Sequence, residues 1–251
     1  ITLRQLLQHR SGLYDVVHDQ DFFHAVFTDP LREYTPRQLV GIATAHPPVF
    51  SPGAGFNYSS TNYILLGLVL QRATHRSVPA LVRDRIARPL GLRHTYLPRT
   101  SPRIPGFHAH GYLPPSLTGA DDYTDITRIS PTALGFAGAL VSTQRDLRRF
   151  YQALLGGRLL RPAQLAQMRT TLNVRDGYDY GLGLYRQRTA CGRVWGHDGN
   201  APGYETYAWN DRSGRRGFVL TVTTQPDDKI GAAESAALEV ASCRMLGRAT
   251  G

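Results

Sequence analysis

The apolar pattern of the chain changes its period partway along, and this change constrains the fold more than any other feature. Up to residue 168 apolar side chains recur mainly at helical spacing, whereas segments 204–209 and 218–224, beyond Gly181, are rich in aromatic and β-branched residues. Residues 211–214 between these segments have the composition of a hairpin turn. The sequence therefore predicts helices followed by antiparallel strands, an α/β chain of the α+β type.

Caps and apolar spacing predict several helices. They are a short segment that follows Thr2 and stops at residues 11–12, a segment that starts at Pro36 and ends before Pro47, and residues 63–70, 143–155, 162–168 and 232–246. The run 63–70 is apolar on nearly all faces, which is typical of a helix inside a protein. Residues 98–132 have no sustained period, and they predict a long loop or a small lobe.

The 251 residues carry a net charge of +10, and Lys229 is the only lysine. The arginines are dispersed and do not alternate with aromatic residues, so we expect no nucleic-acid partner, only a general attraction to anionic polymers such as cell-wall glycans. No apolar run approaches the roughly 20 residues that span a bilayer, so no membrane span is expected. The first residues have neither an initiator methionine nor a signal-peptide pattern, which indicates a start internal to a longer chain.

Two cysteines, Cys191 and Cys243, are too few for a zinc cluster and too far apart for a CxxC redox pair. One disulfide and two buried free thiols are both compatible with this count. His108 and His110 have the spacing of a two-histidine metal site on a strand, but no acidic or cysteine partner stands at ligand spacing. A glycine-rich phosphate loop is also missing, so we expect neither a metal nor a cofactor.

Tyr58 is the first candidate for chemistry. It lies between a Pro/Gly-rich turn and the apolar run 63–70, near a helix N-terminus whose dipole and N–H groups favour an anion. Its phenol is then suited to shuttle a proton. The simpler alternative is that Ser59 or Ser60 caps the helix and Tyr58 only packs.

Residues 195–203 form the second candidate segment, just before a predicted strand. Three glycines, Gly196, Gly199 and Gly203, leave the backbone open to close approach by a ligand. The imidazole of His197 beside this backbone is suited to hydrogen bonding with an acyl group. Taken alone, a segment of this composition is more often only a turn.

Several segments, in their order along the chain, resemble the landmarks of one family. They are residues 9–13, 52–63, 138–147, 180–184 and 197–199. Their order is similar to that in the class C beta-lactamase and D-alanyl-D-alanine carboxypeptidase family of penicillin-binding serine hydrolases, and soluble secreted DD-carboxypeptidases resemble the chain most. The resemblance extends from Ile1 to about Gly247.

The resemblance implies a single beta-lactamase/transpeptidase-like domain over residues 1–251, in which helices flank an antiparallel sheet. A helical lobe is expected at approximately residues 1–135 and a sheet-and-helix lobe at approximately 136–251, without the family's N-terminal strands and nucleophile helix. The similar carboxypeptidases have a disulfide where Cys191 and Cys243 fall. We accordingly expect a monomer that is secreted or otherwise extracytoplasmic.

The implied chemistry is acyl transfer through an acyl-serine, on a peptidoglycan peptide, a beta-lactam or a small ester or amide. Tyr58 matches the tyrosine that relays protons in the Tyr-x-Asn motif. His197 and Gly199 match the ends of the Lys/His-Thr/Ser-Gly motif, which binds the acyl group of the substrate, and the backbone of Asn200 falls where an oxyanion donor is expected. The resemblance thus implies that the Tyr58 phenol and the His197 imidazole act on one substrate.

The chain also departs from the family pattern. It contains no Ser-x-x-Lys, because Pro226 stands at that spacing before Lys229, so the chain alone is not expected to turn over substrate. Ser60 replaces the usual asparagine, and Asp198 replaces the usual threonine or serine. An ionised Asp198 repels a substrate carboxylate unless a cation such as Arg186 compensates, which favours an ester or an amine-bearing peptide. The alternative function is a non-catalytic relative that binds peptidoglycan or a protein partner.

Overall fold

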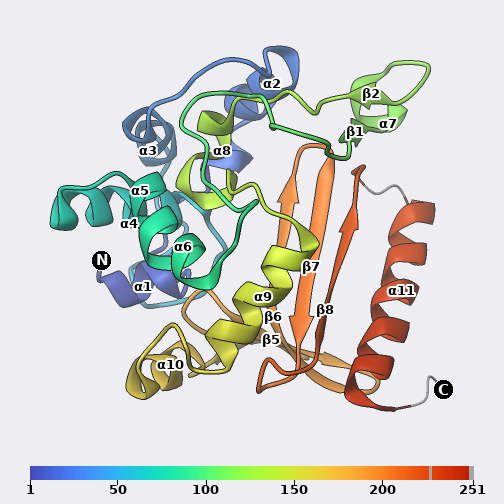
Figure 1. Cartoon of the computed structure of the whole chain (residues 1–251). Helices are drawn as coiled ribbons and strands as arrows, with labels where there is room; N and C mark the ends of the chain where they lie inside the picture. The colour runs from blue at the N-terminus through green and yellow to red at the C-terminus, as the bar shows by residue number, and fades with distance from the viewer. Residues whose placement is uncertain (226–227, 249–251) are drawn as a thin grey trace. The chain divides into compact units, whose positions relative to one another are not determined.

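The structure of the protein is a computed structural model that describes residues 1–225 and 228–248 (Figure 1). The chain forms two compact units. The helical unit comprises Ile1–His108 and Arg128–Val141, and the sheet unit comprises Ala109–Thr127 and Ser142–Gly251. The chain therefore leaves the helical unit after His108 and returns to it for residues 128–141 before it completes the sheet unit.

The helical unit consists of helices of very different lengths. They are α1 (Leu3–Leu7), α2 (Gln20–Thr28), α3 (Pro36–Thr44), α4 (Ser60–Thr74), α5 (Val78–Val82), α6 (Arg88–Leu90) and α8 (Pro131–Gly138), with a 3₁₀ turn at Val16–His18 and a π-helical turn at Arg83–Ala87. Buried side chains from α2, α3, α4 and α8 form its core, in which Leu39 and Ile64 are almost completely buried. One apolar cluster thus holds these helices together.

Two of the predicted helix starts have capping boxes. The Thr2 hydroxyl accepts the N–H of Gln5, and the Gln5 side chain accepts the N–H of Thr2. Thr35 and Gln38 make the same pair of bonds at the start of α3. Each box satisfies N–H groups that the first turn of a helix leaves unpaired, and both predicted starts are confirmed.

The apolar run 63–70 lies within α4, but only part of its surface is buried. Ile64 and Gly67 are buried, and a Cβ on Gly67 would lie 2.0 Å from the ring of Phe136. Val69 and Leu70, by contrast, are 38% and 46% exposed. The prediction of a helix enclosed on all sides is therefore wrong in the chain as described, because one stripe of α4 alone faces the core.

The sheet unit is built on a six-stranded antiparallel sheet with the strand order β3-β4-β5-β6-β7-β8. The strands are β3 (Leu172–Arg175), β4 (Tyr178–Tyr180), β5 (Tyr185–Thr189), β6 (Gly192–Ala201), β7 (Tyr204–Asn210) and β8 (Gly217–Val222). The unit also contains α7 (Pro115–Thr118), α9 (Gln144–Leu155), α10 (Pro162–Met168), α11 (Asp228–Leu246) and the short pair β1 (Tyr112–Leu113) and β2 (Thr124–Asp125). Helices combined with an antiparallel sheet confirm the predicted α+β class.

The hairpin of β7 and β8 is confirmed, with Asn210 opposite Gly217 where the strands leave the turn. The extended region, however, begins before Gly181, because β3 and β4 precede it. Asp176 and Gly177 join these two strands, and the φ of Gly177 is +74°. Asp-Gly is a hairpin signal, but the two strands have four and three residues, too few for a clear alternation.

Two long helices pack against the sheet. α9 starts after Thr143, whose hydroxyl accepts the N–H of Asp146 at 3.2 Å, and it ends before Gly156, as predicted. Its buried residues form one cluster with Trp195 of β6 and Ala208 of β7. In Figure 1 α11 runs beside β8, and it contacts both β6 and β8. The strand β6, which contains residues 195–201, is thus held by packing from both helices.

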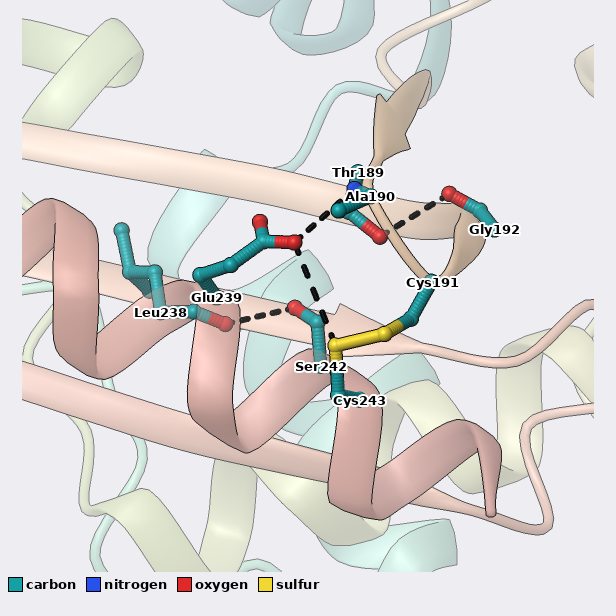
Figure 2. Close-up of a disulfide and its surroundings, with 8 residues drawn as sticks. All are labelled: Thr189, Ala190, Cys191, Gly192, Leu238, Glu239, Ser242 and Cys243. Carbon is teal, nitrogen blue, oxygen red and sulfur yellow. Dashed lines mark hydrogen bonds between the residues drawn. A yellow bond between two sulfur atoms is a disulfide. The ribbon is translucent and has the colours of Figure 1, made fainter. Parts of the chain in front are cut away.

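Figure 2 shows the disulfide that joins Cys191, in the turn between β5 and β6, to Cys243 of α11. The two Cα atoms lie 5.0 Å apart, and 52 positions separate the residues in sequence. Beside the disulfide, the carboxylate of Glu239 accepts the N–H of Ala190 at 2.9 Å. The disulfide implied by the resemblance is thus present, and it links the start of β6 covalently to α11, which restricts the unfolded chain.

Residues 98–132 contain little regular structure, in agreement with the prediction of a loop or small lobe. Their part in the sheet unit has β1, β2 and α7 only. It is fastened to the sheet by the hydroxyl of Tyr204, which donates to the carbonyl of Ala109 at 2.9 Å. Within residues 1–225 and 228–248, no helix combines the length and the apolar character that a bilayer span requires.

Candidate active site

Tyr58 lies in the helical unit, two residues before the start of α4. Its side chain is 42% exposed, and one face of its ring stacks on the imidazole of His9, with centroids 4.0 Å apart and planes inclined by 25°. The imidazole itself is fully buried. Tyr58 therefore presents a phenol at the surface while its ring rests on a rigid support.

The N-terminus of α4 is occupied by a carboxylate of the chain itself. Asp15, which is 3% exposed, accepts the N–H of Ser60 at 3.0 Å. Burial raises the pKa of Asp15, and the N–H groups of Val17 and Ser60 oppose this rise. The carboxyl group of Asp15 thus occupies one N–H group at this helix end.

Ser60, which replaces the usual asparagine, faces Asp15 through its hydroxyl as well as its N–H. Asn62, an amide side chain two residues after Ser60, is fully buried. It accepts the hydroxyl of Ser11 at 2.5 Å and donates to Nδ1 of His9 at 3.2 Å. Asn62 therefore belongs to the interior of the helical unit, and its amide is not a substitute for the missing one. Ser59 is the N-cap residue of α4, but its hydroxyl makes no capping hydrogen bond. The alternative in which Ser59 caps the helix through its side chain is therefore not observed.

His197 lies on β6 in the sheet unit, and both of its ring nitrogens have protein partners. Nδ1 is 2.6 Å from the carbonyl oxygen of Asp198, and Nε2 is 3.0 Å from the hydroxyl of Tyr180. Because a carbonyl can only accept, Nδ1 bears the proton of the neutral ring, and Nε2 accepts the hydroxyl proton of Tyr180. The imidazole is therefore held in one tautomer and one orientation.

Asp198 places a half-exposed carboxylate beside this imidazole, with Oδ1 3.4 Å from Nδ1 of His197. Tyrosines of the same unit surround it. Burial raises the pKa of Tyr178 and of Tyr185, and the negative charge of Asp198 adds to both shifts. These phenols are therefore neutral at physiological pH.

Three glycines of residues 195–203 were predicted to admit a ligand, and the structure distinguishes them. A Cβ on Gly196 would lie 1.8 Å from the carbonyl oxygen of Ala208, and one on Gly203 would lie 2.6 Å from a methyl of Ile126. These two glycines allow close packing of the protein on itself. Around Gly199, apart from the atoms of residues 198–200, no atom of residues 1–225 and 228–248 lies within 4 Å of such a Cβ. Gly199 alone therefore leaves open space next to the backbone.

Arg186 was expected to compensate a charge near the substrate. It forms an ion pair with Asp179 at 2.7 Å, and its guanidinium lies 5.6 Å from the ring centre of Trp195. Burial of Asp179 opposes its ionisation, but hydrogen bonds from Asn173 and Arg186 hold the pKa of this carboxyl below its usual value. Arg186 thus neutralises Asp179, and the group beside the carboxylate of Asp198 is the imidazole of His197, with Oδ1 3.4 Å from Nδ1.

Asn200 joins a buried acidic pair at the end of β6. Its amide donates to the carboxylate of Glu205, which also accepts the hydroxyl of Tyr207 at 3.1 Å. Glu234 of α11 is buried next to Glu205, and its Oε1 has no hydrogen-bond partner among the described residues. Burial and the charge of Glu205 raise the pKa of Glu234. The pair therefore retains a proton more readily than two separate carboxylates.

This raised pKa predicts how stability depends on pH. The folded protein keeps a proton on Glu234 that the unfolded chain releases above the ordinary value of 4.5. Its stabilising contribution is complete below that value and is lost as the pH rises through the raised pKa. We expect Glu234→Gln to raise the melting temperature at pH 7 to 8 and to change it little at pH 4, as measured by thermal unfolding across this range.

The matched control is Glu33→Gln, because Glu33 is an exposed carboxylate. It should leave the melting temperature close to that of the parent protein at each pH in the same range. A fall in the melting temperature of Glu234→Gln at pH 7 would mean instead that the ionised carboxylate is needed in the folded protein.

The sequence analysis included His9 and Tyr180 in family landmarks without giving them a role, and it did not single out Asp15. The bonds of these residues to the motif segments join positions 17 to 50 residues apart in sequence. Within the described part of the chain, one group of three residues has the spacing of metal ligands: Cys191, Glu239 and Cys243. Its two sulfur atoms form the disulfide and are not thiolates.

Comparisons with known proteins agree with this fold. The sequence profile of the Beta-lactamase family matches residues 1–241. Penicillin-binding protein 4* of Bacillus subtilis (strain 168) is 27% identical over 234 residues, which are 82% of this chain and 48% of that protein. The chain spans about half the length of the curated relatives that it matches over most of its own length.

Two solved structures resemble the chain over nearly its whole length. A D-stereospecific amidohydrolase from Streptomyces sp. is 35% identical, with a TM-score of 0.90 over 97% of this chain and 73% of that chain. The D-amino acid amidase from Ochrobactrum anthropi SV3 is 24% identical, with a TM-score of 0.80 over 97% and 72%, and shares the fold. Because the family profile covers nearly all of the sequence and a clearly similar relative has the same fold, the chain belongs to the beta-lactamase family.

Proposed function

We propose that this chain is the larger part of a serine hydrolase that transfers acyl groups through an acyl-serine intermediate. The observation that carries the proposal is the half-exposed phenol of Tyr58, held on a buried imidazole within a member of the beta-lactamase family. A phenol at the surface with a fixed ring is suited to move a proton between a nucleophile and a leaving group.

Tyr58 and His197 serve the same acyl transfer in this proposal. Tyr58 relays a proton from the serine to the leaving group: its phenolic oxygen accepts the serine proton while its own hydroxyl proton passes to the leaving group. The strand around His197 and Gly199 binds the acyl group, and the backbone N–H of Asn200 supports the oxyanion. The serine and its lysine are outside the 251 residues, since none of these residues forms a Ser-x-x-Lys motif.

The substrate that suits this site is an amide or peptide with a free amino group. The half-exposed carboxylate of Asp198 stands where the family pattern has a neutral hydroxyl, and a substrate ammonium group is attracted to it. The relatives described as a D-stereospecific amidohydrolase and a D-amino acid amidase support an amide of D configuration. A peptidoglycan peptide, a beta-lactam or a small ester are further acyl donors compatible with the same chemistry.

We also propose that the protein works outside the cytoplasmic membrane. The support is the disulfide between Cys191 and Cys243, because such bonds persist in oxidising compartments.

The proposal is tested on a version of the protein that includes a Ser-x-x-Lys segment, either from the reading frame before Ile1 or from a relative. The protein is incubated with a fluorescent penicillin and with an activated ester, and the covalent adduct is detected by mass. We expect an adduct on the serine, and its absence when that serine is changed to alanine. A folded protein that forms no adduct with either reagent would refute acyl transfer.

A second function is favoured by one observation, the departures at Ser60 and Asp198 from the family pattern. A non-catalytic relative would bind peptidoglycan without forming an adduct. Sedimentation with purified peptidoglycan separates the two functions. Binding without any adduct supports the non-catalytic one.

A further inference from the structure

We propose that His9 is a positioning residue for Tyr58, in that it fixes the place and direction of the phenol without touching the substrate. The inference rests on the proposed function, which makes Tyr58 the proton relay. Every contact that carries it lies within the helical unit.

His9 binds the backbone on both sides of Tyr58. The N–H of Asn57 donates to the carbonyl oxygen of His9 at 3.0 Å, and the N–H of Ser59 donates to its Nδ1, also at 3.0 Å. The imidazole ring stacks on the Tyr58 ring, with centroids 4.0 Å apart. One residue thus anchors the position before Tyr58, the position after it and the ring itself. These contacts leave the phenol little freedom to turn.

The imidazole is itself held in a defined state. Nδ1 accepts two N–H groups, from the Ser59 backbone and from the Asn62 amide at 3.2 Å, so the proton of the neutral ring is on Nε2. Asn62 is oriented in turn by the hydroxyl of Ser11, which donates to its Oδ1 at 2.5 Å. The rings of Tyr63 and Phe56 lie against other sides of the imidazole. The support under Tyr58 is therefore rigid.

The backbone conformation of His9 indicates that its side chain has a specific task. Its φ is +54°, in the left-handed region that favours glycine. The residue follows the end of α1, where its N–H donates to Leu6 and the next N–H donates to Gln5, as in a common helix termination. Glycine would satisfy this turn at a lower conformational cost. A histidine at this position is explained by what its ring and Nδ1 do for Tyr58.

Three variants separate the parts of this arrangement. His9→Asn keeps a short acceptor for the Ser59 N–H and tolerates a positive φ, but it removes the stacked ring. His9→Phe keeps a ring and removes the acceptor, and His9→Gly suits the turn while removing both. The matched control is Phe56→Leu, which removes a ring that touches the same imidazole without changing the bonds on either side of Tyr58.

The first measurement needs no catalysis. In the folded 251-residue chain with ring-labelled tyrosine, the NMR signal of Tyr58 is assigned by its loss in Tyr58→Phe. The stacked imidazole shifts this signal by its ring current. We expect the shift to be lost in His9→Asn and His9→Gly and kept in Phe56→Leu. An unchanged Tyr58 signal in folded His9→Asn would overturn the inference, whether or not the chain proves to be part of a hydrolase.

The second measurement is acylation by the version that includes Ser-x-x-Lys. We expect His9→Gly to lower the acylation rate constant about tenfold or more at saturating substrate, with KM nearly unchanged, because positioning acts on the reaction step. The acylation rate constants of His9→Asn and His9→Phe should lie between those of His9→Gly and the parent protein. A purely structural role would lower the folded fraction of His9→Gly and of Phe56→Leu alike, while the rate per folded molecule stayed normal, and that result would contradict the inference.

Discussion

Tyr58→Phe in a version of the protein with its Ser-x-x-Lys segment is expected to lower the acylation rate at least about a hundredfold, because it removes one proton relay from the reaction. The ring remains, so its stacking on His9 is retained, and the half-exposed position leaves the folded structure nearly as stable. The rate is measured by stopped-flow with an activated ester or a fluorescent penicillin, and stability by thermal unfolding.

Tyr63→Phe is the matched control for this experiment. Tyr63 lies against the same imidazole, with centroids 5.2 Å apart, and its hydroxyl donates to the carbonyl of Leu7 at 3.1 Å. Removing this hydroxyl should reduce stability by about 1 kcal/mol and leave acylation nearly normal. Near-normal acylation by Tyr58→Phe would show that another group is the base. Tyr178 and Tyr185 of the sheet unit are poor candidates for that group, because their pKa values are raised and they stay protonated.

The elements that the sequence predicted well have local signals. Thr2 and Thr35 each have a glutamine three residues later, and the capping boxes that follow define the starts of α1 and α3. The start of α9 has a simpler local signal, because the hydroxyl of Thr143 accepts the N–H of Asp146. The strands β3 and β4 were missed because they are too short to show a clear alternation, with four and three residues.

The candidate site also has parts that the sequence predicted and parts that it did not. The motif segments around Tyr58 and His197 were visible as residues in a recognisable order, but the hydrogen bonds that hold them were not. Ser59 and His9 are 50 positions apart, and Asp15 is 45 positions from Ser60. Such contacts depend on how α1, its following turn and α4 pack together, and no local propensity encodes them.

Asp198→Thr is expected to reverse the preference between two kinds of substrate. The carboxylate of Asp198 attracts a substrate ammonium group and repels a substrate carboxylate, and threonine keeps a hydrogen-bonding hydroxyl without the charge. At about 4 Å, one charge pair contributes about 1 kcal/mol in water and about 4 kcal/mol near a protein surface, and the half-exposed position places Asp198 between these limits. The ratio of kcat/KM for the two substrates should therefore change by roughly tenfold to hundredfold.

The measurement compares two D-alanine derivatives, an amide with a free amino group and an N-acylated peptide that ends in a free carboxylate. Asp198→Asn is the matched control, because it removes the charge with the smallest change of shape and should shift the ratio in the same direction. Added salt should reduce the preference of the parent protein and leave that of both variants unchanged, because screening acts on the charge alone. If the ratio of kcat/KM is the same in the parent and the variants, the carboxylate of Asp198 faces away from the substrate and does not determine the substrate preference.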